Sequence, residues 1–158
     1  MVDPALAHRS WGDPQRPVDL IFVHANGFSG LTYQGLLQPL QADWRVLAPD
    51  LRGHGRTPLP TQAENRANWN DMRDDLVALL RSLEGPPVVL AGHSMGATLA
   101  LLAAAQAPER VRSLVMLEPG ILTPAAGRSD GDAAPRRLAA GAAAPLGRAG
   151  PAPTASLP

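Results

Sequence analysis

The chain has 158 residues, and its 14 basic and 14 acidic side chains give a formal net charge of zero. This length fits one domain, and the charge balance gives no reason to expect a nucleic-acid or anionic membrane partner. The absence of cysteine excludes disulfides and thiol chemistry, and the four scattered histidines predict no metal site and no cofactor. Without a long apolar run or a secretory signal, the sequence predicts a cytoplasmic protein that has no membrane partner.

Short apolar runs alternate with helical periodicity over residues 1–123. Strands are predicted at 18–23, 44–48, 87–91 and 112–117, with a further edge strand at 5–11. Helices are predicted at 31–42, 72–83 and 97–107. The helix at 72–83 has Asn68 or Asn70 available as its N-cap. Alternation of this kind predicts an α/β fold with a mostly parallel sheet and helices on both faces.

The composition changes sharply after residue 123. Of the 35 residues in 124–158, 23 are Ala, Pro or Gly, and Val, Ile, Phe, Met, Trp and Tyr are absent. Such a segment has too little apolar surface to offset the conformational entropy that ordering costs. We therefore predict a folded unit at 1–123 and a disordered tail at 124–158.

The sequence Gly-His-Ser-Met-Gly at 92–96 lies between a predicted buried strand and a predicted buried helix. This is the context of a G-x-S-x-G nucleophile elbow, in which a sharp turn lifts the central serine above the sheet. Glycines two residues to either side let the strand and the helix approach without a side-chain clash. The hydroxyl of Ser94 and the backbone N–H of Met95 would then lie together at the helix N-terminus.

Three further stretches agree with this motif. Residues 23–28 (VHANGF) follow the first buried strand, residues 50–57 (DLRGHGRT) follow the next, and residues 112–119 (RSLVMLEP) follow the helix after the motif. In order and spacing they resemble the oxyanion loop, the D-x-R-G-H-G-x-S loop and the following strand of the α/β-hydrolase superfamily. The resemblance covers about residues 5–122 and implies the N-terminal half of that fold.

The resemblance implies a serine hydrolase that acts on an ester or a related acyl bond. Ser94 would be the nucleophile, and the Met95 amide would be one oxyanion donor. Two residues separate His24 from the usual glycine, so the second donor is open, with the Phe28 amide preferred and Asn26 next. Asn26 and His24 are also candidate substrate contacts. Haloalkane dehalogenases and epoxide hydrolases of this fold use aspartate as nucleophile, so the serine disfavours them.

The catalytic base is missing where this fold places it. The triad runs in the order serine, acid, histidine, and no histidine follows His93. Glu118 is a candidate acid, and an ordinary strand-end glutamate is the alternative. The earlier histidines are more readily explained as loop-structuring residues than as substitute bases. We therefore expect a truncated hydrolase that is weakly active or inactive, because losing the base costs about a million-fold in kcat.

Two alternatives to an active hydrolase stay open. The scaffold could be a non-catalytic binding module, or the chain could be half of an enzyme that a partner chain completes. The strand at 112–117 would lie at an open sheet edge, and its apolar residues 114–117 would favour self-association there.

Overall fold

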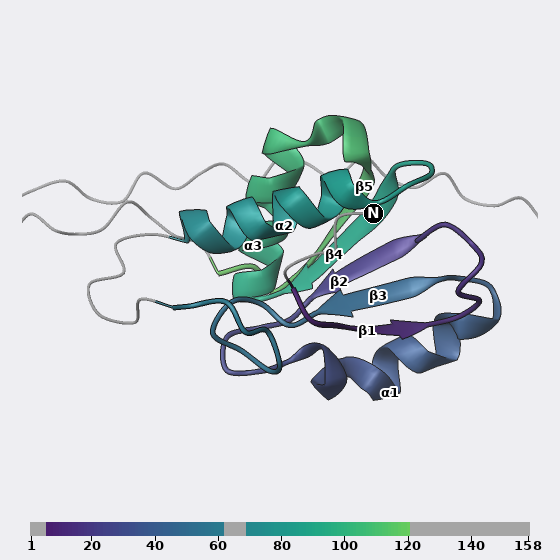
Figure 1. Ribbon diagram of the computed structural model, residues 1–158, viewed down its shortest axis with the longest axis horizontal. Coiled ribbons are helices and arrows are strands. Elements are labelled where there is room, and N and C mark those ends of the chain that lie inside the picture. Colours follow the sequence, from purple (N-terminus) through teal and green to yellow (C-terminus); the bar gives the residue numbers. More distant parts are fainter. Residues whose placement is uncertain (1–5, 62–68, 121–158) are drawn as a thin grey trace, which may run out of the picture. The chain divides into compact units, whose positions relative to one another are not determined.

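The computed structural model describes residues 6–61 and 69–120, so the predicted tail at 124–158 lies outside the described residues. The described chain forms a five-stranded sheet with helices packed on it (Figure 1). The strands are β1 (His8–Trp11), β2 (Leu20–Val23), β3 (Val46–Pro49), β4 (Val88–His93) and β5 (Val111–Leu117). All five were predicted, β2 to β5 from short apolar runs and β1 as a further edge strand at 5–11.

The strand order is β1-β3-β2-β4-β5. β2 pairs in parallel with β3 and with β4, and β4 pairs in parallel with β5, whereas β1 runs antiparallel to β3. This mostly parallel sheet confirms the predicted α/β class. Because the carboxyl ends of β2, β3, β4 and β5 lie at the same edge of the sheet, the loops that follow them meet there.

The helices also follow the prediction, with two local differences. Residues 31–42 form a 3-10 helix η1 (Gly30–Tyr33), a single turn α1 (Gln34–Leu37) and a second 3-10 helix η2 (Gln38–Ala42) in place of one α-helix. Pro39 lacks an N–H and so interrupts the regular hydrogen bonding of this segment. The two longer helices are α2 (Asn70–Ser82) and α3 (Met95–Gln106).

The N-cap prediction for α2 was wrong in detail. The capping position belongs to Trp69, and Asn70 is already the first helical residue. The Asn70 side-chain oxygen accepts a hydrogen bond from the Arg73 guanidinium at 2.9 Å. The other candidate, Asn68, lies outside the described residues.

The core has two layers because the side chains of the strands alternate between the faces of the sheet. Ile21 and Val23 of β2 pack with α2 and α3 on one face, whereas Leu20 and Phe22 pack on the other face with Leu37 of α1. Figure 1 shows α2 and α3 on one side of the sheet and α1 on the opposite side. The predicted helices on both faces are thus present.

β5 forms one edge of the described sheet, since its only strand partner there is β4. Val115 and Leu117 on this strand are 44% and 41% exposed. None of the helices within 6–61 and 69–120 combines the length and the apolar character that crossing a membrane requires. No group of three or more His, Asp or Glu side chains in these ranges is arranged to hold a metal ion.

Candidate functional site

Ser94 occupies the turn between β4 and α3 and has an unusual backbone conformation. Its φ is 52° and its ψ is −118°, and it is one of two non-glycine residues with positive φ in the described part of the chain. Its N–H donates to the Leu117 carbonyl at 2.9 Å, and its carbonyl accepts from the Ala97 N–H at 3.0 Å. The adjacent strand and the first turn of α3 thus hold a conformation that β-carbon sterics disfavour.

The glycines of the 92–96 motif provide the room that this turn needs. A β-carbon at Gly92 would lie 2.4 Å from the Gly96 carbonyl oxygen. A β-carbon at Gly96 would lie 2.2 Å from the Val23 carbonyl oxygen. Both distances are far below van der Waals contact, and the opposing atoms belong to the backbone. Neither position can therefore accept a side chain without moving β4, α3 or β2.

The second positive-φ residue, Glu118, lies at the end of the neighbouring strand, with φ 46°. Its side chain is 92% exposed, and its carboxylate lies 3.9 Å from His93 Nε2. The chain then returns to the Ser94 turn, where the Gly120 N–H donates to the Ser94 carbonyl at 3.4 Å. Two strained residues therefore lie at the carboxyl ends of adjacent strands, an arrangement that is common at functional sites.

His24, at the end of β2, is fully buried between two backbone segments. Its Nε2 accepts a hydrogen bond from the Leu51 N–H at 2.9 Å, which leaves the proton on Nδ1 to be donated to the Ala25 carbonyl at 2.8 Å. Burial lowers the pKa of the imidazole below its ordinary value, and the nearby His54 lowers it further. With 0% exposure and both nitrogens occupied, His24 does not fit its predicted role as a substrate contact.

The loop after His24 distinguishes the two candidates for the predicted second oxyanion donor. The Phe28 N–H donates to the Ala25 carbonyl at 3.2 Å and so closes a tight turn, which argues against the preferred candidate. The Asn26 N–H, the second choice, donates to no acceptor within the described part of the chain. The Met95 N–H belongs to the first turn of α3, where amides have no partner inside the helix.

Tyr33 joins this loop to β4, a role that the sequence did not reveal. Its hydroxyl oxygen accepts a hydrogen bond from the Ala25 N–H at 3.1 Å and lies 2.7 Å from His93 Nδ1. Tyr33 is the only tyrosine in the chain, and 60 residues separate it from His93. No short-range pattern could have linked the two positions.

The loop after β3 packs against the same region. The buried Asp50 carboxylate accepts hydrogen bonds from the Gly30 N–H at 2.8 Å and from the Arg56 N–H at 2.9 Å. On the far side of the loop, His54 Nε2 lies 3.2 Å from the Asn26 side-chain oxygen. The loop after β3 therefore contacts Asn26 within the turn at 25–28 and Gly30 just after it.

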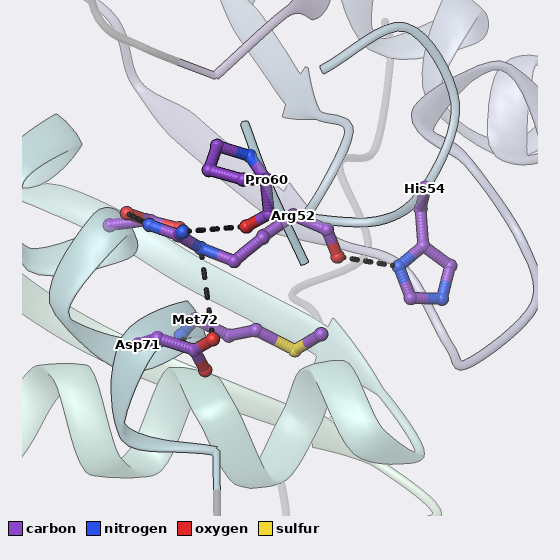
Figure 2. Close-up of polar contacts among 6 residues, drawn as sticks. Arg52, His54, Pro60, Asp71 and Met72 are labelled. Carbon is purple, nitrogen blue, oxygen red and sulfur yellow. Dashed lines mark hydrogen bonds and ion pairs between the residues drawn. The ribbon is translucent and has the colours of Figure 1, made fainter. Parts of the chain in front are cut away.

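Arg52 fastens this loop to α2. Its guanidinium donates two hydrogen bonds to Asp75, at 2.8 and 2.7 Å, and a third to the Pro60 carbonyl at 2.9 Å. Figure 2 shows the guanidinium between Pro60 and Asp71, with His54 bonded to the Arg52 carbonyl. These charged hydrogen bonds to Asp75 raise the pKa of Arg52. The arrangement fastens the loop after β3 to α2.

A general base for Ser94 is absent from the contacts of the described residues. The Ser94 hydroxyl has no hydrogen-bond partner within 6–61 and 69–120. His93 and His24 have both ring nitrogens directed to other groups, and His54 faces Asn26 and its own loop. The remaining histidine, His8, lies on β1 next to the Leu6 carbonyl. Glu118 faces His93, and no described contact joins it to Ser94 through a histidine.

Comparison with known proteins identifies the family. The family described as alpha/beta hydrolase fold matches residues 20–156, and the chain belongs to it. The chain is 33% identical over 99 residues to 2-(acetamidomethylene)succinate hydrolase of Mesorhizobium japonicum. The aligned region covers 63% of this chain and 34% of that protein.

Solved structures agree with this assignment. The thioesterase domain from the curacin biosynthetic pathway has a TM-score of 0.65 and 33% identity, over 72% of this chain and 40% of that one. Haloalkane dehalogenase DbeA from Bradyrhizobium elkani has a TM-score of 0.62 and 28% identity, over 72% of this chain and 38% of that one. The chain thus spans about a third of the length of the Mesorhizobium hydrolase and about two fifths of these two solved structures.

Proposed function

We propose that this chain carries the nucleophile half of a serine hydrolase active site that acts on esters or related acyl compounds. The observation that carries the proposal is the turn at Ser94, where a non-glycine residue has φ 52° between a buried strand and a buried helix. Glycines that admit no β-carbon flank it on both sides. The serine at this position favours acyl chemistry over dehalogenation, whose enzymes in this fold use aspartate there.

In the proposed reaction the Ser94 oxygen attacks the acyl carbonyl carbon, and its proton passes to a base. The negative charge that develops on the carbonyl oxygen is stabilised by the N–H groups of Met95 and Asn26, which have no competing acceptor in the described chain. Collapse of the tetrahedral intermediate expels the leaving group, which takes up a proton, and water then releases the acid from the acyl-serine.

The described contacts provide no general base for Ser94, so the base must come from another source. Every histidine in the sequence precedes Ser94, and the contacts described above occupy those near the site. A non-catalytic binding scaffold, or completion of the site by a partner chain, is the alternative to weak activity of the chain alone. We further propose a small-molecule substrate and a cytoplasmic location, with no nucleic-acid partner because positive and negative charges balance.

A small exogenous base tests this proposal directly. The chain and its Ser94→Ala variant are assayed for p-nitrophenyl acetate hydrolysis over a series of imidazole concentrations. Imidazole hydrolyses this ester unaided, so the quantity of interest is the rate difference between the two proteins. A site that lacks only its base should give a serine-dependent rate that is small without imidazole and rises with its concentration.

The outcomes separate the alternatives. A serine-dependent rate that rises with imidazole supports the hydrolase half-site. Equal rates for both proteins at every imidazole concentration would favour a non-catalytic binding scaffold. If cell extract raises the serine-dependent rate when imidazole does not, a partner chain completes the site.

A further inference from the structure

Tyr33 lies where three segments of the site meet. It ends η1, and its hydroxyl oxygen accepts the Ala25 N–H from the loop after β2. The same oxygen lies 2.7 Å from Nδ1 of His93, the residue directly before Ser94. One side chain thus connects the loop that carries the Asn26 amide with the turn that carries the nucleophile.

Aromatic packing fixes the ring of Tyr33. Its centroid lies 4.6 Å from that of Phe22 on β2 and 6.0 Å from that of Phe28 beyond the turn. The His93 ring stands edge-on to it at 6.0 Å. Because the ring is held on three sides, its hydroxyl is presented at a defined place and loses little further freedom on bonding.

The Tyr33 hydroxyl bridges Ala25 and His93, and the protons on these groups give the two hydrogen bonds a direction. The hydroxyl oxygen accepts a hydrogen bond from the Ala25 N–H, and we assign the one proton of the phenol to a hydrogen bond that it donates to His93 Nδ1. In the neutral imidazole the proton then sits on Nε2, which faces the Glu118 carboxylate at 3.9 Å. His24 has the opposite tautomer, because its Nε2 accepts from the Leu51 N–H.

We propose that Tyr33 is a positioning residue whose hydroxyl sets the distance between the oxyanion loop and the Ser94 turn through the Ala25 N–H and His93 Nδ1. This inference rests on the proposed hydrolase half-site for its catalytic meaning. The Tyr33 hydrogen bonds and the His93 tautomer can be tested separately from catalysis, because they exist whether or not Ser94 reacts.

The test uses the full chain with Tyr33→Phe, which keeps the ring and removes only the hydroxyl. Ser82→Ala is the matched control, because it also removes one part-buried hydroxyl that bonds a backbone group, at the end of α2. Hydrogen exchange of the Ala25 amide and the ¹⁵N shifts of the His93 ring are measured by NMR. The rate of Ser94 modification by a fluorophosphonate, with imidazole added, is resolved into its maximal rate and its half-saturating concentration.

Tyr33→Phe should accelerate Ala25 exchange about fivefold or more and shift the His93 nitrogens, while Ser82→Ala changes neither. The maximal labelling rate of Tyr33→Phe should fall roughly tenfold or more at an unchanged half-saturating concentration, because the oxyanion donor no longer faces the reacting atom.

Different results would overturn the two claims separately. The same Ala25 exchange in both variants, or unchanged His93 nitrogen shifts in Tyr33→Phe, removes the bridge, and a wild-type His93 with its proton on Nδ1 overturns the assigned direction of the Tyr33–His93 hydrogen bond. An intact bridge with equal maximal labelling rates in Tyr33→Phe and Ser82→Ala removes the positioning role. If Ser94 is not labelled in the wild type even with imidazole, the proposed function fails, whereas exchange and tautomer still decide on the bridge.

Discussion

Gly96 determines how closely α3 approaches β2. A β-carbon there would lie 2.2 Å from the Val23 carbonyl oxygen, which is fixed in the sheet. We expect Gly96→Ala to lower the free energy of unfolding by about 1–3 kcal/mol, because overpacking against backbone forces the helix to move. Urea unfolding followed by circular dichroism measures the change.

Gly35→Ala is the matched control, since a β-carbon at Gly35 in α1 meets nothing within 4 Å. The same substitution there should be neutral or stabilising by up to about 1 kcal/mol, because alanine has the higher helix propensity. Equal losses at both positions would mean that close approach at the motif is not what the glycine provides.

His24 makes stability depend on pH in a defined direction. Burial lowers its pKa in the folded state below the ordinary value of 6.5. As pH falls from about 6.5 towards the folded-state pKa, the unfolded chain binds a proton that the folded chain does not, so stability falls. Above that window both states are neutral and this contribution is flat.

His24→Gln should therefore flatten the pH dependence of the unfolding free energy between pH 7 and the folded-state pKa of His24. The variant keeps an acceptor for the Leu51 N–H but cannot titrate there. Comparison at pH 8 gives the pH-independent cost of the substitution. An undiminished slope in the variant would show that other groups cause the pH dependence.

For single residues, the sequence could predict only features that depend on neighbouring positions in the chain. The motif at 92–96 could be located because its glycines and its place between strand and helix are adjacent in the chain. The choice between Phe28 and Asn26 depended on a turn hydrogen bond that the amino-acid sequence does not reveal. The role of Tyr33 depended on contacts with residues eight and 60 positions away.

At the scale of elements, the strands could be predicted because buried parallel strands are short runs of β-branched and other apolar residues. The segment at 30–42 was harder, since Pro39 leaves short 3-10 and α turns where apolar spacing predicts one helix. The start of α2 depended on side-chain hydrogen bonds that compete with capping, as at Asn70.

The Arg52–Asp75 contact links the loop after β3 to α2, and both side chains are largely buried. We expect Asp75→Asn to destabilise the chain by about 1.5–3 kcal/mol, because it leaves a guanidinium with a weaker bidentate partner. Hydrogen exchange over residues 51–60 should rise in this variant.

Asp74→Asn provides the comparison on the same helix. Asp74 is 60% exposed and pairs with its neighbour Arg73, so its loss should change stability by less than about 0.5 kcal/mol. If the two variants behave alike, the Arg52 contact does not hold the loop.

For the molecule as a whole, we predict that copies of the chain associate through the β5 edge. Val115 and Leu117 are exposed on a strand with no second partner in the described sheet. Val115→Lys should lower the apparent mass in concentration-dependent light scattering, because a charge on an edge strand opposes strand pairing.

Leu36→Lys removes an even more exposed apolar side chain, 55% exposed, from α1, which is not part of the β5 edge. It should leave the scattering unchanged if pairing uses the β5 edge. A monomer at all concentrations in the wild type would contradict the prediction.

The role of Ser94 is tested by mapping where a fluorophosphonate reacts with the full chain, by peptide mass spectrometry with imidazole present. We predict one adduct, on Ser94, that is lost in Ser94→Ala and retained in Ser113→Ala, which removes an exposed serine hydroxyl on β5. An adduct spread over several serines, or none on Ser94, would contradict a nucleophile at this turn.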